Sequence, residues 1–222
     1  MATRKSQRLG IIIILVALVI GTLGSFAVMV LGTQNQQKDA AEQQKAMDEY
    51  QKSYQDYQAK LTEQSDELSA QYYPTFGQYA SRVGEFSKDG TPSVQKEDLV
   101  VGEGSEIKDS TSFAAYYIGW NPKGKIFDQS IDGQKLKAPF TIEPSLKDAG
   151  VISGWKEGLV GMKIGGVREI TIPSDKAYGE QGQGDNIPPN TPLKFIVMAV
   201  TPPEKIAMPD YPAGLMQGLG GL

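Results

Sequence analysis

The chain has 222 residues and a formal net charge of −4, and it contains neither cysteine nor histidine. Those two absences exclude Cys or His nucleophiles and general bases, the common Cys/His zinc sites and structural disulfides. Catalysis is left to carboxylates, hydroxyls, lysines or the shape of a binding pocket, with no cofactor and no metal expected. The acidic balance also argues against a nucleic-acid-binding surface, which needs a basic face.

An uncharged segment follows a short basic flank at the start of the chain. Residues 1–8 carry three basic side chains, and the next 23 residues, 9–31, carry no charge. About 20 apolar residues cross a bilayer as a helix, so 9–31 is predicted to be a transmembrane signal anchor. The positive-inside rule places residues 1–8 in the cytoplasm and the rest of the chain outside a cell membrane. A cleaved signal peptide is the alternative, because Ser-Phe-Ala at 25–27 resembles a cleavage site.

Residues 33–92 are predicted to form a helical stalk and a linker. No Gly or Pro occurs between Gly32 and Pro74, and the Gln-, Lys-, Glu- and Ala-rich composition is typical of a long exposed helix. Larger side chains recur along it at steps of three and four residues, forming a seam: Met47, Tyr50, Tyr54, Tyr57, Leu61, the polar Gln64 and Leu68. Such a seam indicates a coiled-coil homodimer or a single amphipathic stalk lying against a neighbouring segment. Tyrosines pack poorly as coiled-coil knobs, which favours the single stalk.

A second, short helical stretch is expected after Pro74. Its apolar residues are predicted to pack back onto the tyrosines of the stalk: Phe76, Tyr79, Val83 and Phe86. The sequence Asp-Gly-Thr-Pro-Ser at 89–93 then breaks the chain.

From residue 93 the pattern changes to short apolar or alternating runs between turn residues. Six runs are predicted to be strands of an antiparallel sheet: 98–106, 110–120, 123–130, 138–144, 166–174 and 192–203. Residues 149–162 place Val151, Ile152, Trp155, Leu159 and Val160 at helical spacing. Residues 93–202 are therefore predicted to be one α+β domain with its helix across the sheet. Residues 203–222 are rich in Pro and Gly and are expected to form a flexible tail. In the alternative, Leu215, Met216 and Leu219 dock onto another surface.

Several aromatic residues of this domain occur in contexts that are unusual for a core. Phe127 precedes Asp128, Trp155 follows Gly154 and Tyr178 opens a Gly-rich loop. A concave site lined by aromatic side chains with a few polar groups typically binds small molecules or peptides, which is one interpretation of these residues. The alternative is that they are ordinary core residues. The loop at 177–190 has no Lys or Arg, so it lacks the lysine with which a P-loop binds phosphate.

Three segments together resemble the FKBP-type peptidyl-prolyl cis-trans isomerases: 116–130 (YYIGWNPKGKIFDQS), 151–179 (VISGWKEGLVGMKIGGVREITIPSDKAYG) and 187–200 (IPPNTPLKFIVMAV). The resemblance covers residues 93–202 with its motifs in order and consistently spaced. It implies a twisted antiparallel β-sheet wrapped around one short helix, with the active pocket between helix and sheet. With the N-terminal segments, the expected fold class is this FKBP-like α+β domain preceded by a transmembrane helix and a long helical stalk.

The resemblance also implies roles for individual residues. Trp155 matches the family's pocket floor, Asp128 its pocket carboxylate, and Tyr178 the hydroxyl that meets a substrate carbonyl. The catalytic walls fall on Tyr117, Phe127 and Phe195, with substrate-binding residues at Phe140, Val151, Ile152 and Ile187. The loop at 177–189 matches the family's flap, flexible enough to adapt to a peptide. Without the resemblance, a turn-forming residue after a strand is the alternative interpretation of Asp128.

The sequence departs from the family's pattern in the flap and in the connection after Asp128. Gln183 stands where many relatives have His, Asn186 where they have an apolar residue, and residues 131–138 offer no Arg partner for Asp128. The connection from Phe140 to Val151 is slightly longer than in small members of the family. These departures bear on macrolide affinity and on the residue preferred before proline. The aromatic floor and walls are intact.

The expected function is that of a membrane-tethered extracytoplasmic peptidyl-prolyl cis-trans isomerase that assists folding of exported proteins. Its substrates are expected to be proline-containing polypeptides. Rotation about an X-Pro amide needs no nucleophile, which agrees with the absence of Cys and His. Two alternatives stand: a proline-peptide-binding module or holdase chaperone with little turnover, and a structural spacer whose pocket is filled by its own side chains.

Overall fold

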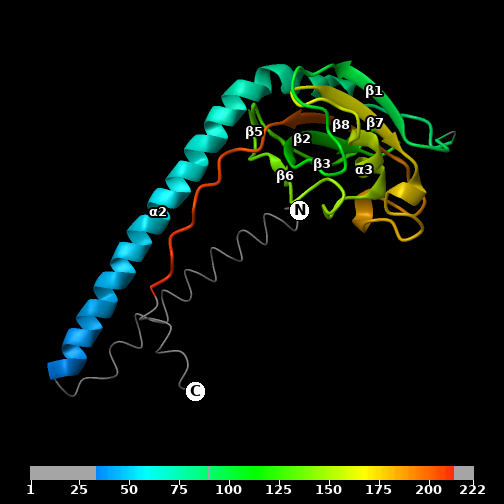
Figure 1. Ribbon diagram of the computed structural model, residues 1–222. Helices are drawn as coiled ribbons and strands as arrows, with labels where there is room; N and C mark the ends of the chain where they lie inside the picture. The colour runs from blue at the N-terminus through cyan, green and yellow to red at the C-terminus, as the bar shows by residue number, and fades with distance from the viewer. Residues whose placement is uncertain (1–33, 90, 213–222) are drawn as a thin grey trace. The chain divides into compact units, whose positions relative to one another are not determined.

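The structure is a computed structural model that describes residues 34–89 and 91–212 (Figure 1). The described residues divide into two compact units, the first made of 34–58 with 207–212 and the second of 59–206. A long helix is confirmed: α2 spans Gln34–Phe76 and includes Pro74, after which a second, separate helical stretch was predicted. The predicted span 9–31 lies outside the described residues, and no helix within them is long and apolar enough to cross a membrane.

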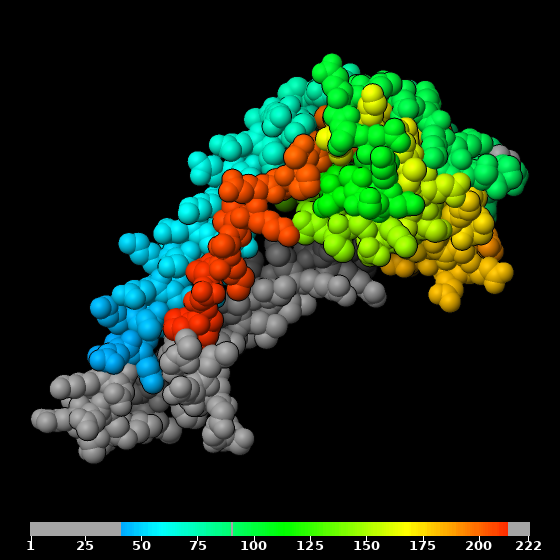
Figure 2. Space-filling view, viewed as in Figure 1, coloured from blue at the N-terminus to red at the C-terminus, as the bar shows by residue number. Residues whose placement is uncertain are grey.

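The seam of α2 forms its less exposed side. Met47 is buried, and Tyr50, Tyr54, Tyr57, Leu61, Gln64 and Leu68 are all half-buried. In the first unit the Tyr50 ring meets Tyr211 edge-on at a centroid distance of 5.1 Å. In the second unit Gln64 Nε2 donates to the Glu204 carbonyl oxygen at 2.8 Å. Within each unit, therefore, the seam contacts the chain's own C-terminal segment (Figure 2).

That C-terminal segment was predicted to be flexible. Its described part, 203–212, has no helix or strand, but it is tied to its surroundings at several points. Besides the Gln64 and Tyr211 contacts, Lys205 Nζ pairs with Glu143 Oε2 at 2.9 Å. These contacts favour the single amphipathic stalk over the coiled coil. Leu215, Met216 and Leu219, for which docking was the alternative, lie outside the described residues.

The second unit contains an antiparallel sheet of six strands within the described residues, in the order β1-β7-β8-β2-β3 with β6 also paired to β2. The strands are β1 (Gln95–Val100), β2 (Phe113–Trp120), β3 (Ile126–Gln129), β6 (Phe140–Ile142), β7 (Val167–Ile172) and β8 (Leu193–Val200). The connection from β3 to β6 holds a small hairpin, β4 (Ile131–Asp132) and β5 (Lys135–Leu136), which was not predicted. The short helix α3 spans Ser153–Leu159.

Alternate residues of each central strand enter two different cores, because successive side chains point to opposite faces of a sheet. On β2, Phe113, Ala115 and Tyr117 belong to the core that contains α3. Their neighbours Ala114, Tyr116, Ile118 and Trp120 belong to a second core. The same alternation on β8 sends Phe195 and Val197 to the first core and Ile196 and Met198 to the second. Both faces of the sheet are therefore buried.

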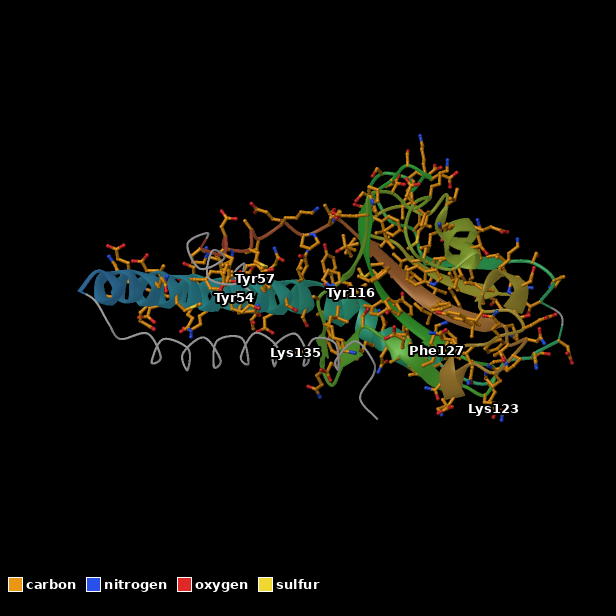
Figure 3. The ribbon with its side chains drawn as sticks, turned by 90° about the horizontal axis from the view of Figure 1, so that it is seen from below. Tyr54, Tyr57, Tyr116, Lys123, Phe127 and Lys135 are labelled. Carbon is orange, nitrogen blue, oxygen red and sulfur yellow. The ribbon has the colours of Figure 1, made fainter. Side chains whose placement is uncertain are left out.

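The second core is closed by the end of α2 and the 3-10 helix η1 (Gly77–Arg82). Phe76 is fully buried in it, and Tyr72, Tyr73, Tyr79, Val83 and Phe86 pack around it. The prediction that Phe76, Tyr79, Val83 and Phe86 pack onto the stalk tyrosines was wrong. They cover the sheet instead, because Tyr116, Ile118, Trp120 and Ile196 form a wide apolar face that must be removed from water. Figure 3 shows Tyr116 where α2 meets the sheet.

Polar contacts hold the same junction together. Glu169 on β7 is buried and pairs with Arg82 of η1 at 3.1 Å and with Lys194 of β8 at 2.7 Å. The backbone N–H of Leu136 on β5 donates to Ser69 Oγ of α2 at 2.8 Å. The unit from 59 to 206 thus begins inside α2, well before the predicted domain start at 93.

Helix α3 is shorter than predicted. Val151 and Ile152 precede it and Val160 follows it as a partly exposed C-cap residue, so these three lie outside the helix. Two glycines form its contact with the sheet instead. A Cβ at Gly154 would lie 2.2 Å from Ile172 Cγ2, and one at Gly158 would lie 3.1 Å from Ile170. The close approach of α3 to β7 therefore depends on these glycines.

Candidate active site

Trp155 of α3 lies among aromatic rings contributed by four strands. Its indole meets Tyr117 of β2 at 5.3 Å, Phe195 of β8 at 5.5 Å and Phe140 of β6 at 6.2 Å, all nearly perpendicular to it. Phe127 of β3 meets Phe195 at 5.5 Å in the same edge-on manner. Edge-to-face pairs of this kind are favourable and geometrically specific. We call these five residues the aromatic cluster.

All ten residues proposed from the sequence gather at this one place in the fold. Trp155, Phe195 and Ile187 are buried members of the first core. The partly buried residues packed against that core include the rest of the apolar set: Tyr117, Phe127, Phe140, Val151, Ile152 and Tyr178. Asp128, the remaining one, is exposed and bonded to Tyr117. Two surface hollows of about 430 and 420 Å³ lie elsewhere, and no residue of the aromatic cluster lines either.

Gly119 makes room for two of the rings. It pairs with Phe195 on one side and with Asp128 on the other, so it lies between β8 and β3. A Cβ at this position would lie 2.6 Å from Phe195 Cε1 and 2.8 Å from Phe127 Cζ. Only a residue without a side chain lets both rings lie over the strand. Sequence reasoning missed Gly119, since its role depends on cross-strand register.

Asp128 orients a hydroxyl of the site. Tyr117 donates its hydroxyl hydrogen to Asp128 Oδ2 at 2.6 Å, while the backbone N–H of Gln129 donates to Asp128 Oδ1 at 2.9 Å. Burial, and then the hydrogen bond to Asp128, raises the pKa of Tyr117 well above its usual value. Tyr117 therefore stays neutral and keeps donating at any physiological pH.

Tyr178 offers a hydroxyl with no hydrogen bond to another described residue, although its ring packs against the first core. Burial, followed by the nearby charge of Asp128, raises its pKa. A neutral phenol beside a carboxylate remains a donor. Tyr178 is therefore able to donate to an incoming acceptor such as a carbonyl oxygen.

The Gly-rich loop after Tyr178 is internally hydrogen-bonded. Gly182 N–H donates to the Tyr178 carbonyl at 3.1 Å, Gln183 N–H to that of Ile187 at 2.7 Å, and Asn190 N–H to that of Gly179 at 2.8 Å. Gly182 has a φ of 65° and lies so close to Ile187 that a Cβ would be 2.3 Å from its carbonyl oxygen. The loop therefore has a defined path between Tyr178 and Ile187, and its predicted flexibility stays a prediction.

Arg168 supports the helix that carries Trp155. Its guanidinium is buried and donates to Asp98 Oδ1 and Oδ2 at 2.6 and 3.0 Å. It also donates to the carbonyl oxygens of Gly158 and Val160 at 2.9 and 3.2 Å, at the C-terminal end of α3. These carbonyls lack partners inside the helix, and a cation is favourable at that end. Arg168 thus joins β1, β7 and α3.

The sequence model of the FKBP-type peptidyl-prolyl cis-trans isomerase family matches residues 103–200, which include all ten candidate residues. The "FK506-binding protein" of Neisseria meningitidis serogroup A is 44% identical over 101 residues, covering 46% of this chain and 88% of that relative. The chain belongs to the FKBP-type peptidyl-prolyl cis-trans isomerase family. "FK506-binding protein 4" of Dictyostelium discoideum is also 44% identical, over 108 residues, but the match spans only 28% of that relative.

A crystal structure of a peptidyl-prolyl cis-trans isomerase from Pseudomonas syringae pv. tomato is similar to the chain, with a TM-score of 0.42 and 31% identity. It covers 56% of this chain and 88% of that one. The family match confirms the predicted FKBP-like sheet with a short helix and identifies the chain as a member of an isomerase family.

Proposed function

We propose that the aromatic cluster, with Asp128 and Tyr178 beside it, catalyses cis-trans isomerisation of X-Pro bonds in polypeptides. The observation that carries this proposal is the buried Trp155, which meets the rings of Tyr117, Phe140 and Phe195 edge-on, together with the Tyr117 hydroxyl that Asp128 fixes. Val151, Ile152 and Ile187 extend this apolar surface and contact the substrate, while the free donor of Tyr178 meets a substrate carbonyl.

The chemistry needs no covalent intermediate. The barrier to amide rotation is about 18 to 20 kcal/mol and arises from resonance that places charge on the carbonyl oxygen. Apolar rings in place of water disfavour that charge-separated planar amide more than the twisted amide, in which resonance is lost. The hydrogen bond from Tyr178 then holds the substrate while the prolyl bond turns.

The test uses a Leu-Pro or Phe-Pro peptide and follows cis-trans exchange with the wild-type chain and with a Phe127→Ala/Trp155→Ala double variant. Truncating large buried aromatics costs about 3 to 5 kcal/mol each, so near-UV circular dichroism checks folding first. We expect exchange to be catalysed by the wild type and strongly reduced in a folded double variant. Full activity in that variant would refute the site. Peptide binding without turnover by the wild type would favour the binding-module or holdase alternative.

We propose further that residues 9–31 anchor the chain in a cell membrane, with the isomerase domain on the extracytoplasmic side, where it assists folding of exported proteins. The uncharged length of 9–31 and its basic flank at 1–8 support this topology. In intact cells, external protease is expected to remove the domain and leave the first residues protected. Recovery of a mature chain that begins at Val28 would show a cleaved signal instead.

The stalk is proposed to be a single helix covered by the chain's own C-terminal segment. Tyr50–Tyr211 and Gln64–Glu204 support this arrangement, because they occupy seam positions that a homodimer needs. Light scattering of the wild-type chain is expected to give a monomer. A dimer that Tyr54→Lys/Leu61→Lys abolishes would restore the coiled-coil alternative.

A further inference from the structure

The turn between β2 and β3 is organised by one buried side chain. Asn121 is 6% exposed, and its Oδ1 accepts hydrogen bonds from the backbone N–H groups of Lys123 at 3.0 Å and Lys125 at 3.1 Å. Its own backbone bonds to Lys125 and Gly124 close the same turn. An Asn that bonds the backbone two residues ahead is a common way of fixing a turn.

The other half of the same amide reaches out of the turn. Asn121 Nδ2 donates to the carbonyl oxygen of Asn186 at 2.8 Å. Asn186 ends the 3-10 helix η3 (Gly184–Asn186) and directly precedes Ile187, which is buried against the aromatic cluster's core. Among the described residues, Asn121 is the only one whose side chain donates a hydrogen bond to residues 184–187 of the loop.

The turn itself is held on its far side by the linker that follows η1. Trp120 Nε1 donates to the Gly84 carbonyl at 3.0 Å, and Phe86 N–H donates to the Pro122 carbonyl at 3.0 Å. Asn121 lies between these two anchored residues. The amide therefore connects a turn that the linker holds in place to a loop that carries part of the site.

We infer that Asn121 is a positioning residue for catalysis, which sets where the loop at 178–187 lies over the aromatic cluster. This inference rests on the proposed isomerase function. Because Tyr178 and Ile187 stand at the two ends of that loop, a loosened loop presents both of them to substrate less often. The cost falls on substrate binding more than on the rotation step, because the aromatic cluster itself is unchanged.

Asn121→Asp keeps the acceptor of the Asn121 side chain and removes its donor. Its carboxylate still accepts from Lys123 and Lys125, so the turn is kept, but an oxygen now faces the Asn186 carbonyl where a donor stood. Lys123→Gln is the matched control, since it changes the net charge by the same −1 in the same turn. Lys123 is exposed (Figure 3), and its side chain makes no hydrogen bond or ion pair with another described residue. Asn121→Ser serves as a second variant, since a hydroxyl can accept in the turn but is too short to reach Asn186.

The experiment measures amide hydrogen exchange in the full chain, together with kcat and KM for a Leu-Pro peptide. For Asn121→Asp and Asn121→Ser we expect exchange at Gln183 to rise roughly threefold to tenfold, with KM rising by a similar factor and kcat changing less than about twofold. Lys123→Gln is expected to match the wild type. Wild-type exchange and KM in a folded Asn121→Ser variant would overturn the inference. Faster amide hydrogen exchange spread evenly over the whole domain would also overturn it, because that is the result of a purely structural role.

The exchange measurement keeps this test separate from the proposed function. If the wild-type chain shows no turnover at all, the proposed function fails, whereas faster exchange confined to the loop in the Asn121 variants still supports the positional role. If the wild type turns over and the variants match it in exchange and KM, only the inference about Asn121 fails.

Discussion

Gly119→Ala tests the aromatic cluster most directly, because it adds a single methyl group between two of its rings. That carbon would lie 2.6 Å from Phe195 Cε1, against 3.4 Å for an ordinary contact, so the Phe195 ring must retreat by about 0.8 Å. The Phe127 ring, at 2.8 Å, must move as well. Both rings are held edge-on by neighbours, and Phe195 also contacts Trp155.

Overfilling of this kind typically costs about 1 to 3 kcal/mol of unfolding free energy. Displacing reacting surfaces by nearly 1 Å also lowers activity, and we expect kcat/KM to fall by about tenfold to a hundredfold. Urea unfolding followed by tryptophan fluorescence measures the first effect, and peptide exchange kinetics measure the second.

Gly150→Ala is the matched control, because no atom lies within 4 Å of the added carbon and φ there is not positive. Its unfolding free energy is expected to stay unchanged or to rise by about 0.4 to 1 kcal/mol. If Gly119→Ala were as stable and as active as this control, the Phe127 and Phe195 rings would not depend on the space that Gly119 leaves.

Three further substitutions test single groups. Tyr178→Phe removes one neutral donor and is expected to lower kcat/KM by several-fold up to about tenfold, without loss of stability. Arg168→Met removes the donors to Asp98, Gly158 and Val160 and is expected to lower the unfolding free energy by about 1.5 to 3 kcal/mol, as measured in urea. Tyr116→Phe removes a buried hydroxyl with no hydrogen-bond partner among the described residues, and the melting temperature is expected to rise. Burial, and then the charge of Tyr72, raises the pKa of Tyr116 in the folded chain. Above about pH 10 a tyrosine ionises in the unfolded chain, so the unfolding free energy of the wild type is expected to fall as pH rises further. The fall is expected to be less steep in Tyr116→Phe.

The candidate site residues were proposed from the sequence, whereas the residues that hold them in place were not. The ten candidates could be proposed because each stands within a short motif, such as Phe127-Asp128 or Trp155 after Gly154, and the fold then brings them to one core. Gly119, Asn121 and Arg168 act through partners distant in sequence, at Phe195, Asn186 and Asp98 respectively. A single sequence carries no signal for such pairs until the strand register is known.

The fold was predicted less fully on the N-terminal side of the sheet. The apolar residues after Pro74 were recognised, but their periodicity fits a stalk contact as well as a sheet contact. The choice depends on Tyr116, Ile118 and Trp120, which alternate with site residues on β2 and need a cover of their own. The β4–β5 hairpin escaped prediction because its strands are only two residues long and Leu136 is buried by α2 and the second core.

That second core yields a prediction about where the isomerase domain begins. A fragment of residues 93–202 contains every candidate site residue but lacks the side chains of Phe76, Tyr72 and Phe86 that cover the far face of the sheet. Trp120, Tyr116, Ile118 and Ile196, each no more than 1% exposed, would then face water.

Burying one large apolar side chain contributes about 1.5 to 3 kcal/mol, and a domain's total stability is about 5 to 15 kcal/mol. Exposing four such residues therefore removes a large share of the stability, and it leaves an apolar patch that promotes aggregation. The fragment of residues 59–206 keeps both cores and is expected to melt cooperatively and remain monomeric. The fragment of residues 93–202 is expected to melt at a much lower temperature or to aggregate, as followed by circular dichroism and light scattering. Equal melting temperatures for the two fragments would show that the end of α2 merely rests on the sheet, and the linker's support of the Asn121 turn would lose its physical basis with it.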